Sequence, residues 1–178
     1  MAGRSRLSLR LPLTVLLLLN LLFVLLFQLR NCGLEQYAGC LGQEQCLVLP
    51  DGQFNGYSSG ELQTFMAKLG EPGRRFYAWS EMTLDLLYPL IYGALLLALL
   101  RRVFPLAPWW PTALPVLLIM GLDWTENAVL TGLAVATLPL QPFADYASLA
   151  TQGKFLLVAL VLLVLAGGWV RQRYRGKT

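Results

Sequence analysis

Four apolar stretches in this sequence are each long enough to cross a lipid bilayer, and they constrain the fold more than any other feature. They cover about residues 11–29, 81–101, 112–138 and 146–170. A helix of about 20 residues spans the hydrocarbon layer, and only helices and closed barrels satisfy the backbone there. The sequence therefore predicts an all-α membrane protein, a four-transmembrane-helix bundle that forms a single membrane domain over residues 1–178.

The composition agrees with a membrane protein and excludes several classes of chemistry. Charged residues make up 13% of the chain, whereas soluble domains carry about 25%. The chain has no histidine, which excludes Ser-His-Asp catalysis and His-based zinc sites. The net charge is only +4, and the basic residues flank apolar runs, so no nucleic-acid partner is expected.

The positions of these basic residues predict the orientation of the chain. They precede the first span, follow the second and follow the fourth, at Arg4, Arg6, Arg10, Arg101, Arg102, Arg171, Arg173, Arg175 and Lys177. Because cytoplasmic loops are enriched in Lys and Arg, both termini are expected to be cytoplasmic, with the loop 31–80 outside. The first span could alternatively be a cleaved signal peptide. Its apolar run is long for one and no small-residue cleavage site follows it, which favours an uncleaved helix.

The outer loop contains all three cysteines of the chain, Cys32, Cys40 and Cys46. Outside the cytoplasm, three cysteines predict one disulfide and one free thiol, and the sequence leaves the pairing open. The chain lacks a CxxC pair, so a structural disulfide is a better interpretation than a redox function.

A short amphipathic helix is expected within the outer loop, from Ser58 to Gly70. Ser58 and Glu61 have the spacing of a capping box, and glycine suits the C-terminal cap. Apolar residues recur at helical spacing, at Leu62, Phe65, Met66 and Leu69. Such a helix could lie on the outer membrane surface, cover the end of the bundle or simply pack on the loop.

Ionisable residues inside the predicted spans are the strongest indication of a site. Asp85 lies 16 residues before Arg101 and Glu126 lies 16 residues after Trp110, which places both about 24 Å from the inner anchors. Lys154 lies 17 residues before Arg171, about 25 Å away. These three side chains are therefore expected at one level in the outer half of the membrane, where each must face the bundle interior and find a partner.

The residues around this level predict an acidic pocket with an aromatic rim. Helical spacing joins them into one candidate ligand-binding set: Asp85, Asp123, Glu126, Asn127, Lys154, Tyr88, Tyr92, Glu81 and Trp124. Pro89 removes the amide that would bond the Asp85 carbonyl, which leaves that carbonyl free. Counting Asp85, Asp123 and Glu126 against Lys154 leaves two uncompensated negative charges, which a proton or a bound cation would relieve.

Three interpretations of the pocket follow. It could bind or transport a lipid-like or cationic small molecule, or protons. It could be a structural polar network that fastens the helices of an assembly protein. It could belong to a metal-independent enzyme that modifies a lipid. The sequence indicates no catalytic residue, no metal, no cofactor and no oligomeric state; the lipid bilayer is the one certain partner.

Two resemblances accompany these predictions. The segments GYSSGEL, LGEPGRRFY, SEMTLDLLYPLIYG and DWTENAVL, within roughly residues 56–130, resemble an uncharacterised group of bacterial four-span integral membrane proteins. That resemblance implies a bacterial cytoplasmic (inner) membrane and no activity. The layout alone is similar to the emopamil-binding and sigma-2 receptor superfamily, which binds sterols and amphiphilic amines. The sterol isomerases of that superfamily rely on a histidine, which this chain lacks.

Overall fold

A computed structural model describes residues 3–43 and 46–175 of the protein, and the side chains of residues 13–43 and 46–174. It contains four long helices, α1 (Gly3–Tyr37), α2 (Ser59–Val103), α3 (Trp109–Ala134) and α4 (Leu140–Arg175), and one short 3-10 helix, η1 (Pro50–Gly52). Each long helix is apolar enough to cross a membrane. No strand occurs in this described part of the chain, so the all-α four-helix prediction is confirmed.

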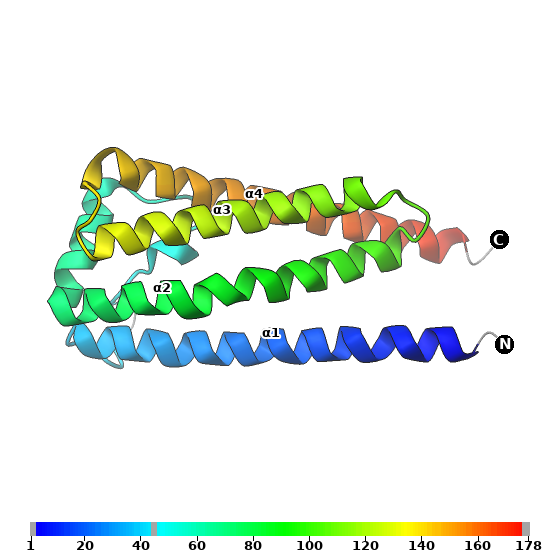
Figure 1. The fold of residues 1–178 in the computed structure, drawn as a ribbon, viewed down its shortest axis with the longest axis horizontal. Coiled ribbons are helices and arrows are strands. Elements are labelled where there is room, and N and C mark those ends of the chain that lie inside the picture. Colours follow the sequence, from blue (N-terminus) through cyan, green and yellow to red (C-terminus); the bar gives the residue numbers. More distant parts are fainter. Residues whose placement is uncertain (1–2, 44–45, 176–178) are drawn as a thin grey trace.

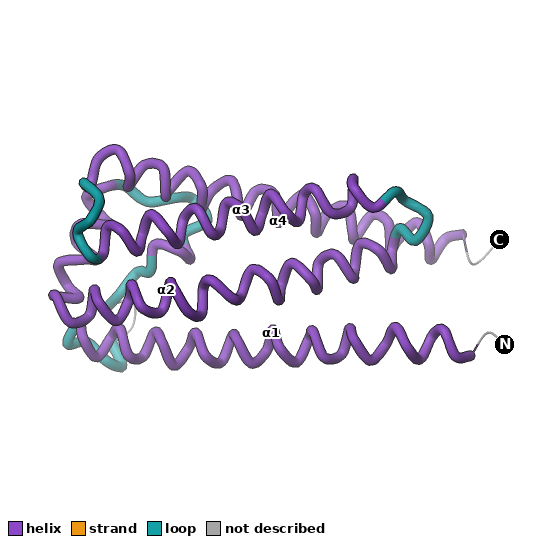
Figure 2. Tube along the Cα trace, in the orientation of Figure 1, coloured by secondary structure: helices purple, strands orange, loops and turns teal. Residues whose placement is uncertain are grey.

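The helices run up and down, and the loops gather at the two ends of the bundle (Figures 1 and 2). α2 is the central element because it packs against α1, α3 and α4, while α3 also packs against α4. Both ends of the chain lie at the same end of the bundle (Figure 1). Of the flanking basic residues, Lys177 lies outside the described residues, and so do the side chains of Arg4, Arg6, Arg10 and Arg175.

The observed helices are longer than the predicted spans at three of the four positions. α1 continues to Tyr37 and α2 begins at Ser59, so both extend well into what the sequence indicated as the outer loop. The α3 helix ends at Ala134, four residues before the predicted end. There the amides of Thr137 and Leu138 both bond the Gly132 carbonyl, and this turn closes the helix.

The amphipathic segment at the start of α2 covers the loop end of the bundle. The predicted capping box is present, with Ser58 accepting from the Glu61 amide and the Glu61 carboxylate accepting from the Ser58 amide. Gly70 has a φ of 62° and breaks the helix, as its predicted role as a cap requires. The apolar face packs with Leu34, Tyr77 and Leu130 in one cluster. The segment therefore packs inward on the bundle.

One disulfide joins Cys40 to Cys46, with the two Cα atoms 6.1 Å apart, and Cys32 is a free, exposed thiol on α1. The prediction of one bridge and one remaining thiol is confirmed. The bridge closes the turn that follows α1, so it holds the start of the loop that carries η1.

Replacing Ser58 with alanine tests the capping box. The change removes the side-chain acceptor for the Glu61 amide, and lost caps of this kind cost about 1 kcal/mol. We expect a lower midpoint in detergent thermal unfolding. Ser59→Ala is the matched control, because Ser59 is already inside the helix; equal destabilisation by both changes would contradict the role of the cap.

Candidate functional site

Lys154 of α4 anchors the first of two buried ionic clusters. Its Nζ atom lies 2.7 Å from Asp123 Oδ1 and 2.6 Å from Glu126 Oε2, both on α3. Tyr92 of α2 donates to the second Asp123 oxygen at 2.7 Å, and Thr151 donates to the second Glu126 oxygen at 2.6 Å. Each carboxylate thus has a partner for both oxygens, and three helices meet here.

Arg30 of α1 is the centre of the second cluster. Its guanidinium contacts Asp85 Oδ2 at 2.6 Å, Asp51 Oδ2 at 3.0 Å and Glu81 Oε1 at 3.4 Å. The side chain of Arg30 is 2% exposed and that of Glu81 is 0% exposed. Glu81 has no hydrogen-bond donor within the described residues, so only the guanidinium charge compensates its burial. The Arg30 guanidinium also lies over the ring of Tyr77, 5.4 Å from its centre.

Pro89 shapes the α2 segment between the two clusters. Because proline lacks an amide N–H, the Asp85 carbonyl has no partner within the helix, and the Asn127 side chain donates to it from α3 at 2.9 Å. One residue further on, Trp124 donates its indole N–H to the Leu86 carbonyl at 3.0 Å. The free carbonyl predicted from the sequence is therefore present, and α3 supplies its donor.

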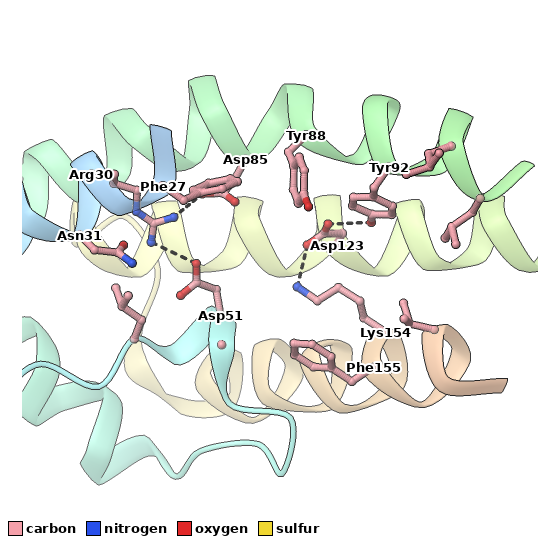
Figure 3. A pocket seen from close by; sticks show the side chains of 15 residues that line it. Phe27, Arg30, Asn31, Asp51, Asp85, Tyr88, Tyr92, Asp123, Lys154 and Phe155 are labelled. Atoms are coloured by element: carbon pink, nitrogen blue, oxygen red, sulfur yellow. Dashed lines mark hydrogen bonds and ion pairs between the residues drawn. The ribbon is translucent and has the colours of Figure 1, made fainter. Parts of the chain in front are cut away.

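A cavity of about 450 Å³ lies between the two clusters. Arg30, Asp51, Asp85, Asp123 and Lys154 form its charged wall, Phe27, Tyr88, Tyr92 and Phe155 its aromatic wall, and Leu95, Leu96 and Val158 its apolar end. In Figure 3 the two tyrosines from α2 face Phe155 from α4 across the space, and Lys154 reaches between them toward Asp123. The cavity is charged at one end and apolar at the other.

Five of the nine predicted site residues line this cavity, namely Asp85, Tyr88, Tyr92, Asp123 and Lys154. The other four lie just behind it. Glu81 and Glu126 belong to the ionic clusters, and Asn127 and Trp124 of α3 donate hydrogen bonds to backbone carbonyls of α2. The predicted level of Glu126 and Lys154 agrees with their direct contact.

Arg30 and Asp51 are not among the site residues predicted from the sequence, so the predicted count of charges was incomplete. Arg30 follows directly after the predicted first span and reads there as a flanking charge, but α1 continues for seven further residues. The structure thus pairs Asp85 with Arg30 and not with Lys154. Asp51 lies on η1, in a loop whose course no helical spacing predicts. The available signal for Arg30 was its position, one residue beyond the end of an apolar run.

The three carboxylates around Arg30 are also the kind of group that binds metal ions. Ligand oxygens of Asp51, Glu81 and Asp85 all lie within 4.8 Å of one another. The Arg30 guanidinium, however, contacts all three. The cation that this cluster holds is therefore its own arginine, and a metal ion would have to displace it.

The loop between α1 and α2 is fixed to the bundle next to these clusters. The Tyr57 amide donates to the Ser148 hydroxyl of α4 at 2.9 Å, and Tyr57 is 7% exposed. Burial raises the pKa of the Tyr57 hydroxyl, and the nearby Glu126 charge raises it further. The tyrosine therefore stays neutral, and η1 lies against α4 with Asp51 aimed at Arg30.

Comparison of the chain with known protein families, with curated protein sequences and with solved structures finds no significant match.

A double-mutant cycle tests the coupling between Pro89 and Asn127. Asn127→Leu removes the donor to the Asp85 carbonyl, and such interhelical bonds in membranes contribute roughly 0.6 and at most about 1.7 kcal/mol. Pro89→Ala restores a helical amide for the same carbonyl. We expect Asn127→Leu to lower the free energy of unfolding in mixed micelles more in wild type than in the Pro89→Ala background. Equal losses in both backgrounds would show that the bond does not depend on the proline.

Proposed function

We propose that this protein binds an amphiphilic small molecule with a positively charged head group in the cavity between its two ionic clusters. The observation that carries the proposal is the cavity itself, about 450 Å³ in volume, with carboxylates at one end and leucine and valine side chains at the other. Ligand pockets are typically apolar spaces of this order with a few placed polar groups.

The charge balance supports a cationic head group. Within the described clusters, five carboxyl groups face two cationic side chains. Carboxylates that are taken out of water without a partner are costly, so the excess favours a bound cation or bound protons. Asp51 and Asp85 keep side-chain exposures of 18% and 13%, and both line the cavity. A cationic head group could therefore reach them.

The aromatic wall supports the same class of ligand. Tyr88 and Tyr92 pack edge to face, with ring centres 5.2 Å apart, and Phe27 packs edge to face on Tyr88 at 5.1 Å. Aromatic faces attract cations, and quaternary ammonium groups are bound in this way. The rings would add affinity for an alkylated ammonium group that the carboxylates alone would not give.

A structural role is the second candidate, and the connectivity of the clusters favours it. Arg30 joins α1 to α2, Tyr92 joins α2 to α3, and Lys154 joins α4 to α3. Membrane helices do use such polar contacts to associate. In this case the cavity would be a by-product of a network whose only role is to hold the bundle together.

Native mass spectrometry of the detergent-purified protein distinguishes the two candidates. Wild type is compared with Asp51→Asn and Asp85→Asn, which keep side-chain size and remove the charge of a carboxylate that lines the cavity. For a binding protein we expect a copurified cationic amphiphile on wild type and its loss from both folded variants. Glu71→Gln is the matched control, because the Glu71 side chain is 66% exposed and pairs only with Arg75 on the surface.

Two results of this experiment would contradict the proposed binding. Absence of any adduct, together with earlier melting of both cavity variants, supports the structural role and contradicts binding. An adduct that persists equally on all four proteins places the ligand outside the cavity, which also contradicts the proposal.

We further propose that both termini face the cytoplasm and that the end of the bundle carrying η1 faces outward. The support is the positive-inside rule. Arg101 and Arg102 lie in the last turn of α2, Arg171 and Arg173 lie near the end of α4, and both helices end where the termini lie (Figure 1). The cytoplasmic membrane of a bacterium is the membrane that the sequence resemblance implies.

Single-cysteine labelling tests this orientation. In a Cys32→Ser background, Phe54→Cys places a thiol on the loop, at a position 67% exposed, and Arg175→Cys places one at the other end. A membrane-impermeant maleimide should label the first in intact cells and the second only after permeabilisation. The reverse pattern would overturn the proposed orientation.

A further inference from the structure

A second hollow, of about 510 Å³, lies at the end of the bundle that carries the termini. It is lined by Leu13 of α1, by Leu99, Arg102 and Val103 of α2, and by Leu165, Ala166, Trp169 and Gln172 of α4. The cavity between the ionic clusters is lined largely by the same three helices. Both spaces therefore lie between α1 and α4, with α2 as their common floor.

The floor is one continuous face of α2. The cavity uses Asp85, Tyr88, Tyr92, Leu95 and Leu96, and the hollow uses Leu99, Arg102 and Val103. Apart from the adjacent pairs Leu95–Leu96 and Arg102–Val103, successive positions are three or four residues apart, which is the spacing of neighbours on one helix face. Only one helical turn separates Leu95 from Leu99, so the two spaces adjoin along α2.

The packing of the bundle explains why this face stays accessible. α1 packs on α2, and α4 packs on α3 and α2. Between the two spaces, Val161 of α4 is buried in a cluster with Leu100 of α2, whereas Leu162 is 51% exposed. We define the α2 groove as the cavity, the hollow and the α2 face that joins them.

The length of the groove indicates what could occupy it. Asp85 and Arg102 are 17 residues apart, or about 25 Å along a helix. Half of the hydrocarbon layer measures only about 15 Å. A tail that filled the groove from the charged end would cross the midplane of the bilayer. At the far end, the Gln172 side chain donates to the Val103 carbonyl at 2.6 Å, and polar groups replace the apolar lining.

We propose that the ligand of the cavity is a single-tailed, long-chain amphiphile whose hydrocarbon tail lies in the α2 groove, past the bilayer midplane and into the second hollow. The inference rests on the proposed function and adds the shape of the ligand. Two-chain lipids with leaflet-length tails fit this path poorly, because the groove is bounded by one helix on each side and is longer than a leaflet.

Photocrosslinking in nanodiscs tests the proposal with two long-tailed alkyltrimethylammonium probes. One carries a diazirine beside the head group and the other carries it at the far end of the tail. We expect the first to label cavity residues such as Tyr88 and Phe155, and the second to label Leu99, Val103 or Ala166. Excess unlabelled amphiphile should suppress both. Ala166→Trp should abolish the specific tail label and retain the head label, whereas Ala159→Trp, an exposed α4 position outside the groove lining, should retain both.

Two failures can be told apart. If the head label stays in the cavity while the tail label scatters over lipid-facing residues such as Leu156 and Leu163, the groove proposal is overturned and the proposed function stands. If the head label also scatters and resists competition, both proposals are overturned.

Discussion

The low dielectric constant of the bilayer interior requires every charge in this bundle to find a partner, and the helix arrangement follows from that requirement. Arg30 and Lys154 each bind more than one carboxylate, and each does so across helices. A lone charge in such a place costs several kcal/mol. Any sliding or rotation of α4 against α3 would separate Lys154 from two acids at once. The pairs thus fix the register of helices whose leucine-rich surfaces would pack almost equally well in several registers.

The central position of α2 depends on its proline as much as on its charges. A straight, fully bonded helix would present no free carbonyl to α3. Pro89 frees the Asp85 carbonyl, and Asn127 and Trp124 donate to the consecutive carbonyls of Asp85 and Leu86, about one turn before the proline. Close approach is possible nearby because Gly93 lacks a side chain; a Cβ atom there would lie 2.5 Å from Met120 Sδ. The same segment therefore both locks α3 in place and directs Tyr88 and Tyr92 toward the cavity.

Most of this arrangement could be predicted from the sequence, because membrane helices have a fixed rise and their charged residues have few allowed positions. Counting residues from the inner anchors placed Glu126 and Lys154 at one level, and they are in contact. The partner of Asp85 could not be found in this way. Arg30 borders an apolar run. Whether α1 ends there or continues depends on the packing of its Leu34 into the core cluster against which Phe76 of α2 also packs, and residue spacing does not reveal this packing. Asp51 reaches the site through an irregular loop, for which no periodic pattern exists.

The uneven packing of the bundle links its stability to the proposed binding. The α3 helix is held on both sides by α2 and α4, and it carries the acids that pair with Lys154. By contrast, α1 packs along one face of α2 and exposes most of its leucines. Its polar attachment near the end that carries η1 is Arg30, and this is the residue that closes the charged end of the cavity. A bound cation near Asp85 would compete with Arg30 for the same carboxylate. The proposed ligand would therefore couple to the attachment of α1 through one guanidinium group. Occupancy of the cavity should loosen α1 from α2 at the end that carries η1 and leave the contact between α3 and α4 intact.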